Sequence, residues 1–145
     1  MKRMTFKELG IDELYAICKL RQDVFVVEQN SIYTDLDDLD QLAMHYLDLN
    51  KNGELLGYAR YREVGNGDFK LERVVLRKDA RGTGRGKALI ESILADIKGI
   101  SPIANVTLSA QTNAVKLYRL FGFQEQGEPY DDGGIEHITM TLQLN

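Results

Sequence analysis

The sequence predicts a single mixed α/β domain, and three observations support this fold class. The chain has 145 residues, enough for one hydrophobic core and short for two. No internal repeat, low-complexity tract or Pro/Ser-rich linker divides residues 1–145. Strand-like segments joined by Gly-rich turns are interrupted by segments with helical periodicity. The expected element order is β-α-βββ-α-β-α-ββ around one sheet.

The N-terminal part predicts a strand and then a helix. The strand extends to Leu9, and Gly10 ends it. Asp12 is expected to cap a helix, because the apolar residues after it recur at helical spacing: Leu14, Ile17, Cys18 and Phe25. Residues 35–40 are acidic and are expected to form a solvated loop. The alternatives are that these residues recognise a cationic acceptor or bind a metal. The central glycine and closing Glu of a calcium loop are missing, which argues against the metal.

Three consecutive antiparallel strands are expected next. Strands at residues 44–49 and 55–61 flank an Asn-Gly pair at residues 52–53, which favours a tight hairpin turn. A second Gly-rich turn at residues 65–68 leads into a strand at residues 69–77.

The C-terminal half predicts two helices and three strands. One helix is marked by apolar residues on one side and ends at Gly99: Leu89, Ile90, Ile93, Leu94 and Ile97. After a strand at residues 103–109, a second helix opens at Thr112 or Asn113 and ends at Gly122. Two final strands, near Phe123 and at residues 135–142, flank the turn-rich residues 129–134.

The composition is that of an ordinary globular protein, with 43% hydrophobic and 28% charged residues. A formal net charge of −4 argues against a mainly electrostatic nucleic-acid binder. The single cysteine, Cys18, has no disulfide partner and is expected to be a buried structural thiol. With no signal-peptide pattern and no apolar window of membrane-spanning length, the sequence predicts a cytoplasmic protein without membrane contact.

The loop at residues 81–86 reads Arg-Gly-Thr-Gly-Arg-Gly and connects a predicted strand to a predicted helix. Glycines let the backbone approach a diphosphate, and the amides of a helix N-terminus attract negative charge. A Walker loop fails here because Arg81 and Ala88 occupy key positions, and the glycine spacing differs from a dinucleotide fingerprint. A flexible surface turn is the structural alternative.

Arg81-x-x-Gly84-x-Gly86, after a strand that ends Val74-Val75-Leu76, resembles the acetyl-CoA signature of the GCN5-related N-acetyltransferases (GNAT). The resemblance implies one mixed, mostly antiparallel sheet of about six or seven strands, flanked by about four helices, with splayed central strands. It implies acetyl-CoA as cosubstrate and no metal. It assigns pantetheine contacts to Val74, Val75 and Leu76, and diphosphate contacts to the amides of Arg81, Gly82, Thr83, Gly84, Arg85, Gly86 and Lys87.

Two further segments carry the resemblance. Residues 113–123 look like the segment that lines the other side of the cleft in this superfamily, which implies that Asn113 contacts the cofactor and Tyr118 lies near the thioester sulfur. Residues 20–29, the polar residues that follow and residues 134–140 are similar to the ElaA-like group.

The implied reaction is transfer of an acetyl group to an amine by direct attack in a ternary complex, which needs no enzyme nucleophile. Tyr118 is expected to protonate the leaving thiolate, with a core aromatic as the alternative. A backbone N–H within residues 74–76 is expected to polarise the carbonyl.

Several residues are candidates for the proton acceptor and the acceptor site. Glu72 shares a strand face with the cofactor residues and is a candidate base, with an ion pair to Arg73 as the alternative. Glu28 is a candidate base or a ligand for the acceptor's ammonium, with a helix cap as the structural alternative. His45 and His137 are candidate acceptor-site residues, with structural histidines as the alternative.

The rival hypothesis is a non-catalytic acyl-CoA-binding or sensing module on the same scaffold. A domain without ligand is argued against by Gly84, Gly86, Asn113 and Tyr118. The acceptor is expected to be a small-molecule or peptide amine, and polyamine, amino acid, aminoacyl analogue, antibiotic, protein N-terminus and lysine all stay open. Dimers are frequent in this superfamily, so a homodimer is compatible with the sequence.

Overall fold

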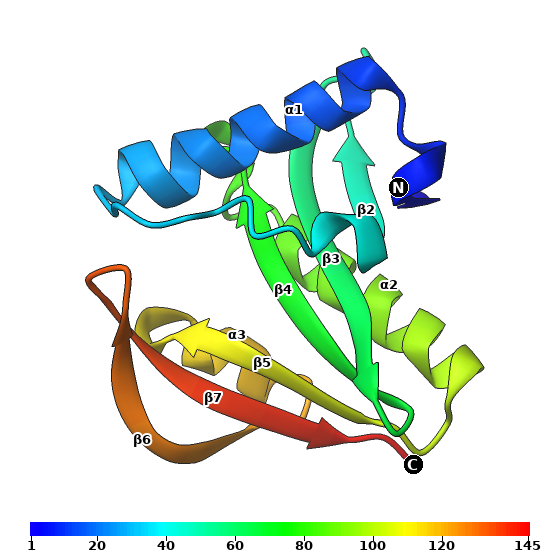
Figure 1. Ribbon diagram of the computed structural model, residues 1–145, viewed down its shortest axis with the longest axis vertical. Coiled ribbons are helices and arrows are strands. Elements are labelled where there is room, and N and C mark those ends of the chain that lie inside the picture. Colours follow the sequence, from blue (N-terminus) through cyan, green and yellow to red (C-terminus); the bar gives the residue numbers. More distant parts are fainter.

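The computed structural model describes residues 1–145 as one seven-stranded sheet with three α-helices (Figure 1). The strand order is β1-β2-β3-β4-β5-β7-β6, and every neighbouring pair is antiparallel except β4 and β5. This confirms the predicted fold class and its single sheet. The strands are β1 Lys2–Thr5, β2 Met44–Leu49, β3 Leu55–Gly65, β4 Asp68–Leu76, β5 Asn105–Gln111, β6 Gln124–Asp132 and β7 Ile135–Gln143.

The helices are α1 Ile11–Arg21, α2 Arg85–Ile100 and α3 Val115–Arg119. Three α-helices form instead of about four, because residues Gln22–Glu28 continue α1 as a π-helix rather than forming a separate helix. Short 3₁₀ turns at Phe6–Glu8, Asp40–Leu42, Lys78–Ala80 and Thr112–Ala114 complete the elements.

The helices cover opposite faces of the sheet. On one face, α1 and the π-helix pack Ile17, Leu20 and Val24 against Leu47, Tyr58 and Val75. On the other face, α2 and α3 belong to a cluster of 18 buried residues. Four apolar residues of α2 are fully buried there, and burial stabilises the fold by about 1.5–3 kcal/mol for each such side chain: Leu89, Ile90, Ile93 and Ile97.

The central strands β4 and β5 diverge, as the family resemblance implies. They pair only at Phe69↔Val106 and Lys70↔Thr107. A bulge in β4 accompanies the divergence, since Tyr58 pairs with Val75 but Arg60 pairs with Glu72. Figure 1 shows the wedge that opens between the two strands. The edge of β4 that faces β5 therefore lacks a strand partner beyond Lys70.

Two local predictions are corrected at the N-terminus. β1 ends at Thr5, and residues up to Glu8 form a 3₁₀ turn instead of continuing the strand. The N-cap of α1 is Gly10 rather than Asp12, because the Glu13 carboxylate accepts a hydrogen bond from the Gly10 amide at 2.9 Å.

The turn predicted at residues 129–134 is shorter than expected. β6 continues to Asp132, so only Gly133 and Gly134 form the turn, with φ of +63° and +83°. Pro129 is compatible with β6 because this is an edge strand and its register shifts between Gln126 and Tyr130.

Three of the four acidic residues in the loop at residues 35–40, Asp35, Asp37 and Asp40, form ion pairs with buried arginines instead of being solvated, whereas Asp38 is exposed as predicted. Arg21 contacts Asp35 at 2.8 Å and Asp40 at 2.7 Å. Arg60 contacts Asp37 at 2.7 Å and Asp40 at 2.6 Å. Both guanidinium groups are fully buried, so these pairs fix the segment onto the sheet and neutralise Asp35, Asp37 and Asp40, three of the carboxylates that were candidates for a cation or metal site.

Candidate active site

The Gly-rich loop joins β4 to α2 and presents unpaired amides. Gly84 is the N-cap of α2 with φ +82°, and Gly82 has φ +77°, conformations that favour glycine. No backbone N–H from Arg81 through Lys87 donates a hydrogen bond within the protein, and the first amide that does so is Ala88, to the Gly84 carbonyl at 3.1 Å. This run of free donors at a helix N-terminus is an anion-binding arrangement.

The arginine side chains of this loop are already paired. Arg81 contacts the Glu28 carboxylate through two nitrogens at 2.7 and 2.9 Å and also donates to the Leu76 carbonyl. Arg85 contacts both carboxylate oxygens of Asp48 at 3.0 Å. The loop therefore offers an anion its backbone amides and the exposed side chain of Lys87 first.

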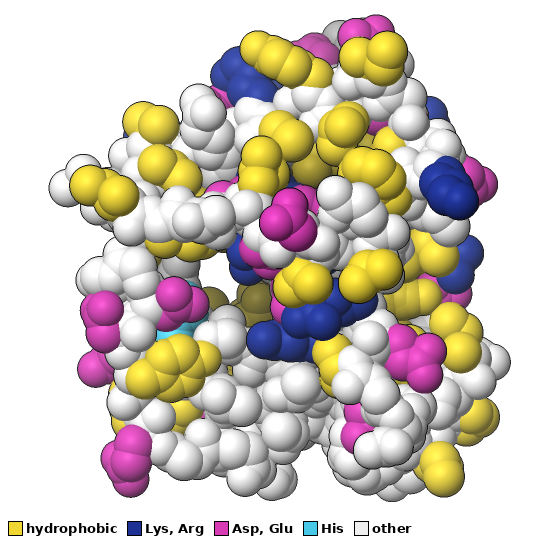
Figure 2. Space-filling model, in the orientation of Figure 1, with side chains coloured by type: hydrophobic (Ala, Val, Ile, Leu, Met, Phe, Trp, Pro, Cys, Tyr) yellow, Lys and Arg dark blue, Asp and Glu magenta, His cyan; other side chains and the backbone are white.

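A cavity of about 620 Å³ lies in the wedge between β4 and β5. Figure 2 shows the opening between the part of the molecule that carries α1 and the part that carries the β6–β7 hairpin. The lining includes residues of β4, of the loop, of the 3₁₀ turn Thr112–Ala114 and of α3 that were predicted to contact the cofactor: Val74, Val75, Leu76, Arg81, Gly86, Asn113 and Tyr118.

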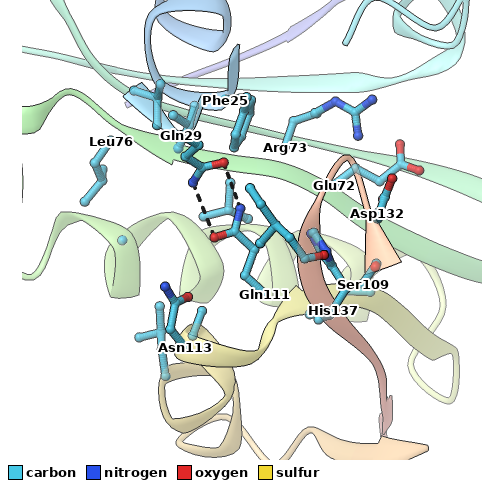
Figure 3. A pocket seen from close by; sticks show the side chains of 18 of the residues that line it. Phe25, Gln29, Glu72, Arg73, Leu76, Ser109, Gln111, Asn113, Asp132 and His137 are labelled. Atoms are coloured by element: carbon cyan, nitrogen blue, oxygen red, sulfur yellow. Dashed lines mark hydrogen bonds between the residues drawn. The ribbon is translucent and has the colours of Figure 1, made fainter. Parts of the chain in front are cut away.

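Two side-chain amides bridge this cavity. Gln29 donates to Gln111 at 3.3 Å, and Gln111 donates back to Gln29 at 3.0 Å. Leu76 and Asn113 lie to one side of the bridge, whereas Glu72, Ser109, Asp132 and His137 lie to the other (Figure 3). The bridge thus divides the cavity into a half next to the Gly-rich loop, named the cofactor half after the contacts that the sequence predicts there, and a distal half.

Residues 14–144 match the model of the family described as Acetyltransferase (GNAT) domain. This chain belongs to the GNAT family. It is 38% identical to the protein ElaA of Escherichia coli over 144 residues, covering 94% of this chain and 92% of that protein. Together with the structural match below, this places the chain in the ElaA-like branch.

Solved structures of GNAT proteins superpose closely on this fold. Escherichia coli ElaA and an acyl-CoA N-acyltransferase from Pseudomonas aeruginosa each match with a TM-score of 0.89 and 34% identity, covering 97% of this chain and 96% of the other. An aminoglycoside 6'-N-acetyltransferase complexed with coenzyme A has a TM-score of 0.77 at 13% identity over 99% and 97% of the two chains, which shows a shared fold alone.

Tyr118 lies in the wall of the cavity between β4 and β5. It is 8% exposed, lines the cavity from α3 and packs edge-to-face on Phe123 with ring centroids 6.0 Å apart. Burial raises the pKa of Tyr118 to about 12. The phenol therefore keeps its proton at neutral pH, and both predicted environments, the core and the cavity wall, apply to the same ring.

Glu72 lines the distal half but is heavily paired. Its carboxylate contacts Arg60 at 2.8 Å, Arg62 at 2.9 Å and Lys70 at 3.7 Å, rather than Arg73. Burial by itself would raise the pKa of Glu72, but Arg62 and Arg60 outweigh it and lower the pKa. A carboxylate held in this way is a weak proton acceptor.

Glu28 lies at the cofactor end of the cavity, next to the loop. The hydrogen bonds from Arg81 lower the pKa of this exposed carboxylate. Its ion pair with Arg81 therefore holds Glu28 at the Gly-rich loop.

The structure separates the two histidines. His45 is buried outside the cavity, where its Nδ1 lies 2.6 Å from the Tyr58 hydroxyl and its Nε2 lies 2.8 Å from the Asp40 carbonyl. The predicted acceptor-site role of His45 is therefore replaced by a structural one, because both ring nitrogens are occupied within the fold. His137 does line the cavity.

Sequence reasoning missed four residues of the distal half and its bridge: Gln29, Gln111, Ser109 and Asp132. No local motif marks them, because their proximity depends on strands that meet only in the folded sheet. No group of three or more His, Cys, Asp or Glu side chains gathers where it would hold a metal ion. No helix has the length and apolar character needed to cross a bilayer.

Proposed function

We propose that this chain is an acetyl-CoA-dependent N-acetyltransferase in which the acceptor amine attacks the thioester directly. The observation that carries the proposal is that two unsatisfied backbone features open on one cavity. These are the unpaired amides of residues 81–87, a loop that lines the cavity at Arg81 and Gly86, and the edge of β4 that has no strand partner. A linear ligand with a diphosphate at one end and amide groups along its arm is complementary to both.

Cofactor contacts follow from this arrangement. The loop amides from Arg81 to Lys87 bind the diphosphate, and the unpaired edge at Val74–Leu76 pairs with the amides of the pantetheine arm. Asn113 contacts the arm from the opposite wall, where it is exposed and lines the cavity. The Pseudomonas aeruginosa relative described as an acyl-CoA N-acyltransferase supports an acyl-CoA as the ligand of this cavity.

Acetyl transfer needs a neutral amine, a polarised carbonyl and a proton for the leaving thiolate. A backbone N–H within residues 74–76 polarises the carbonyl, since this bulged edge has amides without a strand acceptor. Tyr118 gives its phenolic proton to the thiolate, because burial keeps it protonated. Cys18 does not line the cavity, and direct attack requires no thiol nucleophile.

The ion pairs of Glu28 and Glu72 favour supporting roles over direct proton acceptance. Glu28 positions Arg81 beside the diphosphate loop. Glu72 orders Arg60 and Arg62 behind the distal half. We further propose a cytoplasmic site of action, consistent with the single cysteine, and an amine on a small molecule or peptide as acceptor.

The test combines binding with turnover. Acetyl-CoA and free CoA are each added in a thermal-shift assay, and thiol release from acetyl-CoA is then followed across a broad panel of amines. We expect stabilisation by both nucleotides and amine-dependent thiol release. Binding without thiol release for any amine would instead favour an acyl-CoA-sensing module, and absence of binding would overturn both.

A further inference from the structure

His137 has one ring nitrogen whose role the backbone fixes. Its Nδ1 lies 2.7 Å from the Ile135 carbonyl, which can only accept a hydrogen bond, so Nδ1 carries the proton. Nε2 therefore holds a lone pair in the neutral ring, and it has no hydrogen-bond partner within the protein. The ring stacks on Tyr130 at a centroid distance of 6.2 Å and lies in the distal half of the cavity (Figure 3).

Asp132 is the second unengaged group of this half. It lines the cavity at the end of β6, is exposed, and takes part in no hydrogen bond or ion pair within the protein. Register places it on the same face as His137, because Tyr130 pairs with His137 and Asp132 pairs with Ile135. An unpaired carboxylate beside a lone-pair nitrogen forms a binding site for an ammonium group.

The hairpin that carries both residues has a strong excess of negative charge. Residues 120–145 contain five carboxylates and no lysine or arginine, so this segment alone exceeds the chain's formal net charge of −4: Glu125, Glu128, Asp131, Asp132 and Glu136. Only Glu125 is neutralised by an ion pair, with Arg119. Such a field attracts a cation that carries more than one charge more strongly than a singly charged one.

The opposite wall is cationic but mostly neutralised. Arg73 is paired with Asp35 and Asp37, and Glu72 takes up the charge of the arginines behind it. Lys70 is the loosely held cation, 3.7 Å from Glu72. Tyr118, Tyr130 and Tyr33 are also near the cavity, and Glu28 and Arg81 line it as an ion pair at the Gly-rich loop. The free negative charge therefore lies on the side of Asp132.

We propose that the distal half is the acceptor site of the proposed acetyltransferase, and that it takes a primary ammonium of a linear aliphatic di- or polyamine at Asp132. In this site His137 Nε2 accepts the proton that the ammonium must lose. The inference rests on the proposed function and names the substrate class and the base for it.

The proton balance is complete. The ammonium gives one proton to His137 Nε2, and the free amine nitrogen forms a bond to the acetyl carbon as the carbon–sulfur bond breaks. The thiolate becomes a thiol with a proton from Tyr118, and the second proton leaves the nitrogen as the amide forms and restores the Tyr118 phenol through water. His137 returns its proton to water, so the products are the acetamide, free CoA and one proton.

An α-amino acid fits this half poorly. Its carboxylate lies two bonds from the amine nitrogen and would meet Asp132 and the acidic hairpin with like charge. A diamine instead places its second cation farther along the same acidic surface. Acceptors of equal chain length that differ only in the charge at the far end should therefore be distinguished by this site.

The experiment uses three acceptors of equal chain length: 1,4-diaminobutane, butylamine and 4-aminobutanoate. Thiol release from acetyl-CoA is measured for the full chain. We expect kcat/KM to fall in that order, by about tenfold at each step, because the far end changes from cation to neutral to anion. Preference for 4-aminobutanoate, or equal rates for all three, would overturn the assigned substrate class.

Two variants test the roles of the named residues. Asp132→Asn is expected to raise KM for 1,4-diaminobutane about tenfold with little change in kcat, whereas Glu136→Gln on the outer face removes the same charge and should have a much smaller effect. His137→Gln is expected to lower kcat about a hundredfold. It should also remove the part of the pH–kcat/KM rise that is not due to deprotonation of the amine itself.

The outcomes separate this inference from the function on which it rests. Acetyl-CoA affinity, measured by calorimetry, should be unchanged in both variants, which shows that the fold and cofactor half are intact. If His137→Gln keeps the wild-type kcat and pH profile, His137 is not the base even though the chain is an acetyltransferase. If no amine in the panel releases thiol while acetyl-CoA binds, the proposed function itself fails.

Discussion

Gln29 and Gln111 are 82 residues apart in the chain, yet their side-chain amides exchange two hydrogen bonds across the cavity. Gln29 follows the π-helix that continues α1, and Gln111 ends β5. The pair therefore joins the two walls of the wedge that the splayed strands leave open, between the cofactor half and the acceptor half (Figure 3).

This reciprocal pair should contribute measurably to stability. A double-mutant cycle with Gln29→Ala, Gln111→Ala and the double variant is expected to give a coupling energy of about 1 kcal/mol in denaturant unfolding. The reason is that each partly buried side-chain amide provides the hydrogen-bond donor and acceptor that the other needs. A coupling energy near zero would show that the hydrogen bonds between Gln29 and Gln111 contribute nothing to the stability of the fold.

Replacement of Gly84 by valine should remove acetyl-CoA binding. The N-cap has φ +82°, which a β-branched residue rarely adopts, and a side chain there would stand in the path of a diphosphate. We expect affinity in calorimetry to fall by more than about tenfold, since the strained loop loses its amide geometry. Gly99→Ala, at the far end of α2 in open space, is the matched control and should bind normally. Unchanged affinity of the Gly84 variant would contradict the loop assignment.

Tyr118→Phe should lower turnover by about ten- to a hundredfold while acetyl-CoA affinity stays within about twofold. The change removes the proton donor but keeps the ring that packs on Phe123. Because burial raises the pKa of Tyr118 to about 12, the wild-type enzyme should show no loss of activity from phenol ionisation between about pH 6 and 9. Steady-state kinetics with the best acceptor measure both effects, and equal turnover would remove Tyr118 from the mechanism.

Asp37 should make folding stability depend on acid pH. Burial raises its pKa, but Arg60 and Arg73 overcome this and lower it from an ordinary value of 3.8 to about 2. A lowered carboxylate pKa adds stability that is fully present above the unfolded value and is lost as the pH falls toward 2. The contribution is about 2 kcal/mol at neutral pH.

The check is to measure unfolding by denaturant between about pH 5 and 2 for the wild type and for Asp37→Asn. The variant should be less stable at neutral pH and should lose less stability over the acid range. Asp23→Asn, whose carboxylate is exposed on the π-helix Gln22–Glu28 and pairs only with Lys19, is the control and should follow the wild type. Parallel curves for wild type and Asp37→Asn would exclude the assigned role.

Local patterns along the chain determined the sheet-and-helix order and the cofactor loop. The helical spacing from Leu89 to Ile97 predicted α2, and the Gly-rich turn at residues 65–68 predicted the β3–β4 hairpin. The glycines at 82 and 84 predicted an anion-binding turn before α2. These features depend on residues within a few positions of each other, since turn geometry, helical period and capping are short-range properties.

Long-range pairing decided what each polar residue does. The acidic residues 35–40 were expected in solvent, but Arg21 and Arg60 form ion pairs with Asp35, Asp37 and Asp40. His45 was a candidate for the acceptor site, yet Tyr58 and the Asp40 carbonyl enclose it. In both cases the partner comes from another element, so the sequence near the residue carries no record of it.

The sequence by itself therefore determined the family, the order of elements and the position of the cofactor loop. Only the tertiary structure decided which edge of β4 is unpaired, which histidine reaches the cavity, and that Gln29 meets Gln111. The physical reason is that backbone conformation is set largely by neighbours in the chain. The charge state and accessibility of a side chain depend instead on groups that packing brings to it from other strands and helices.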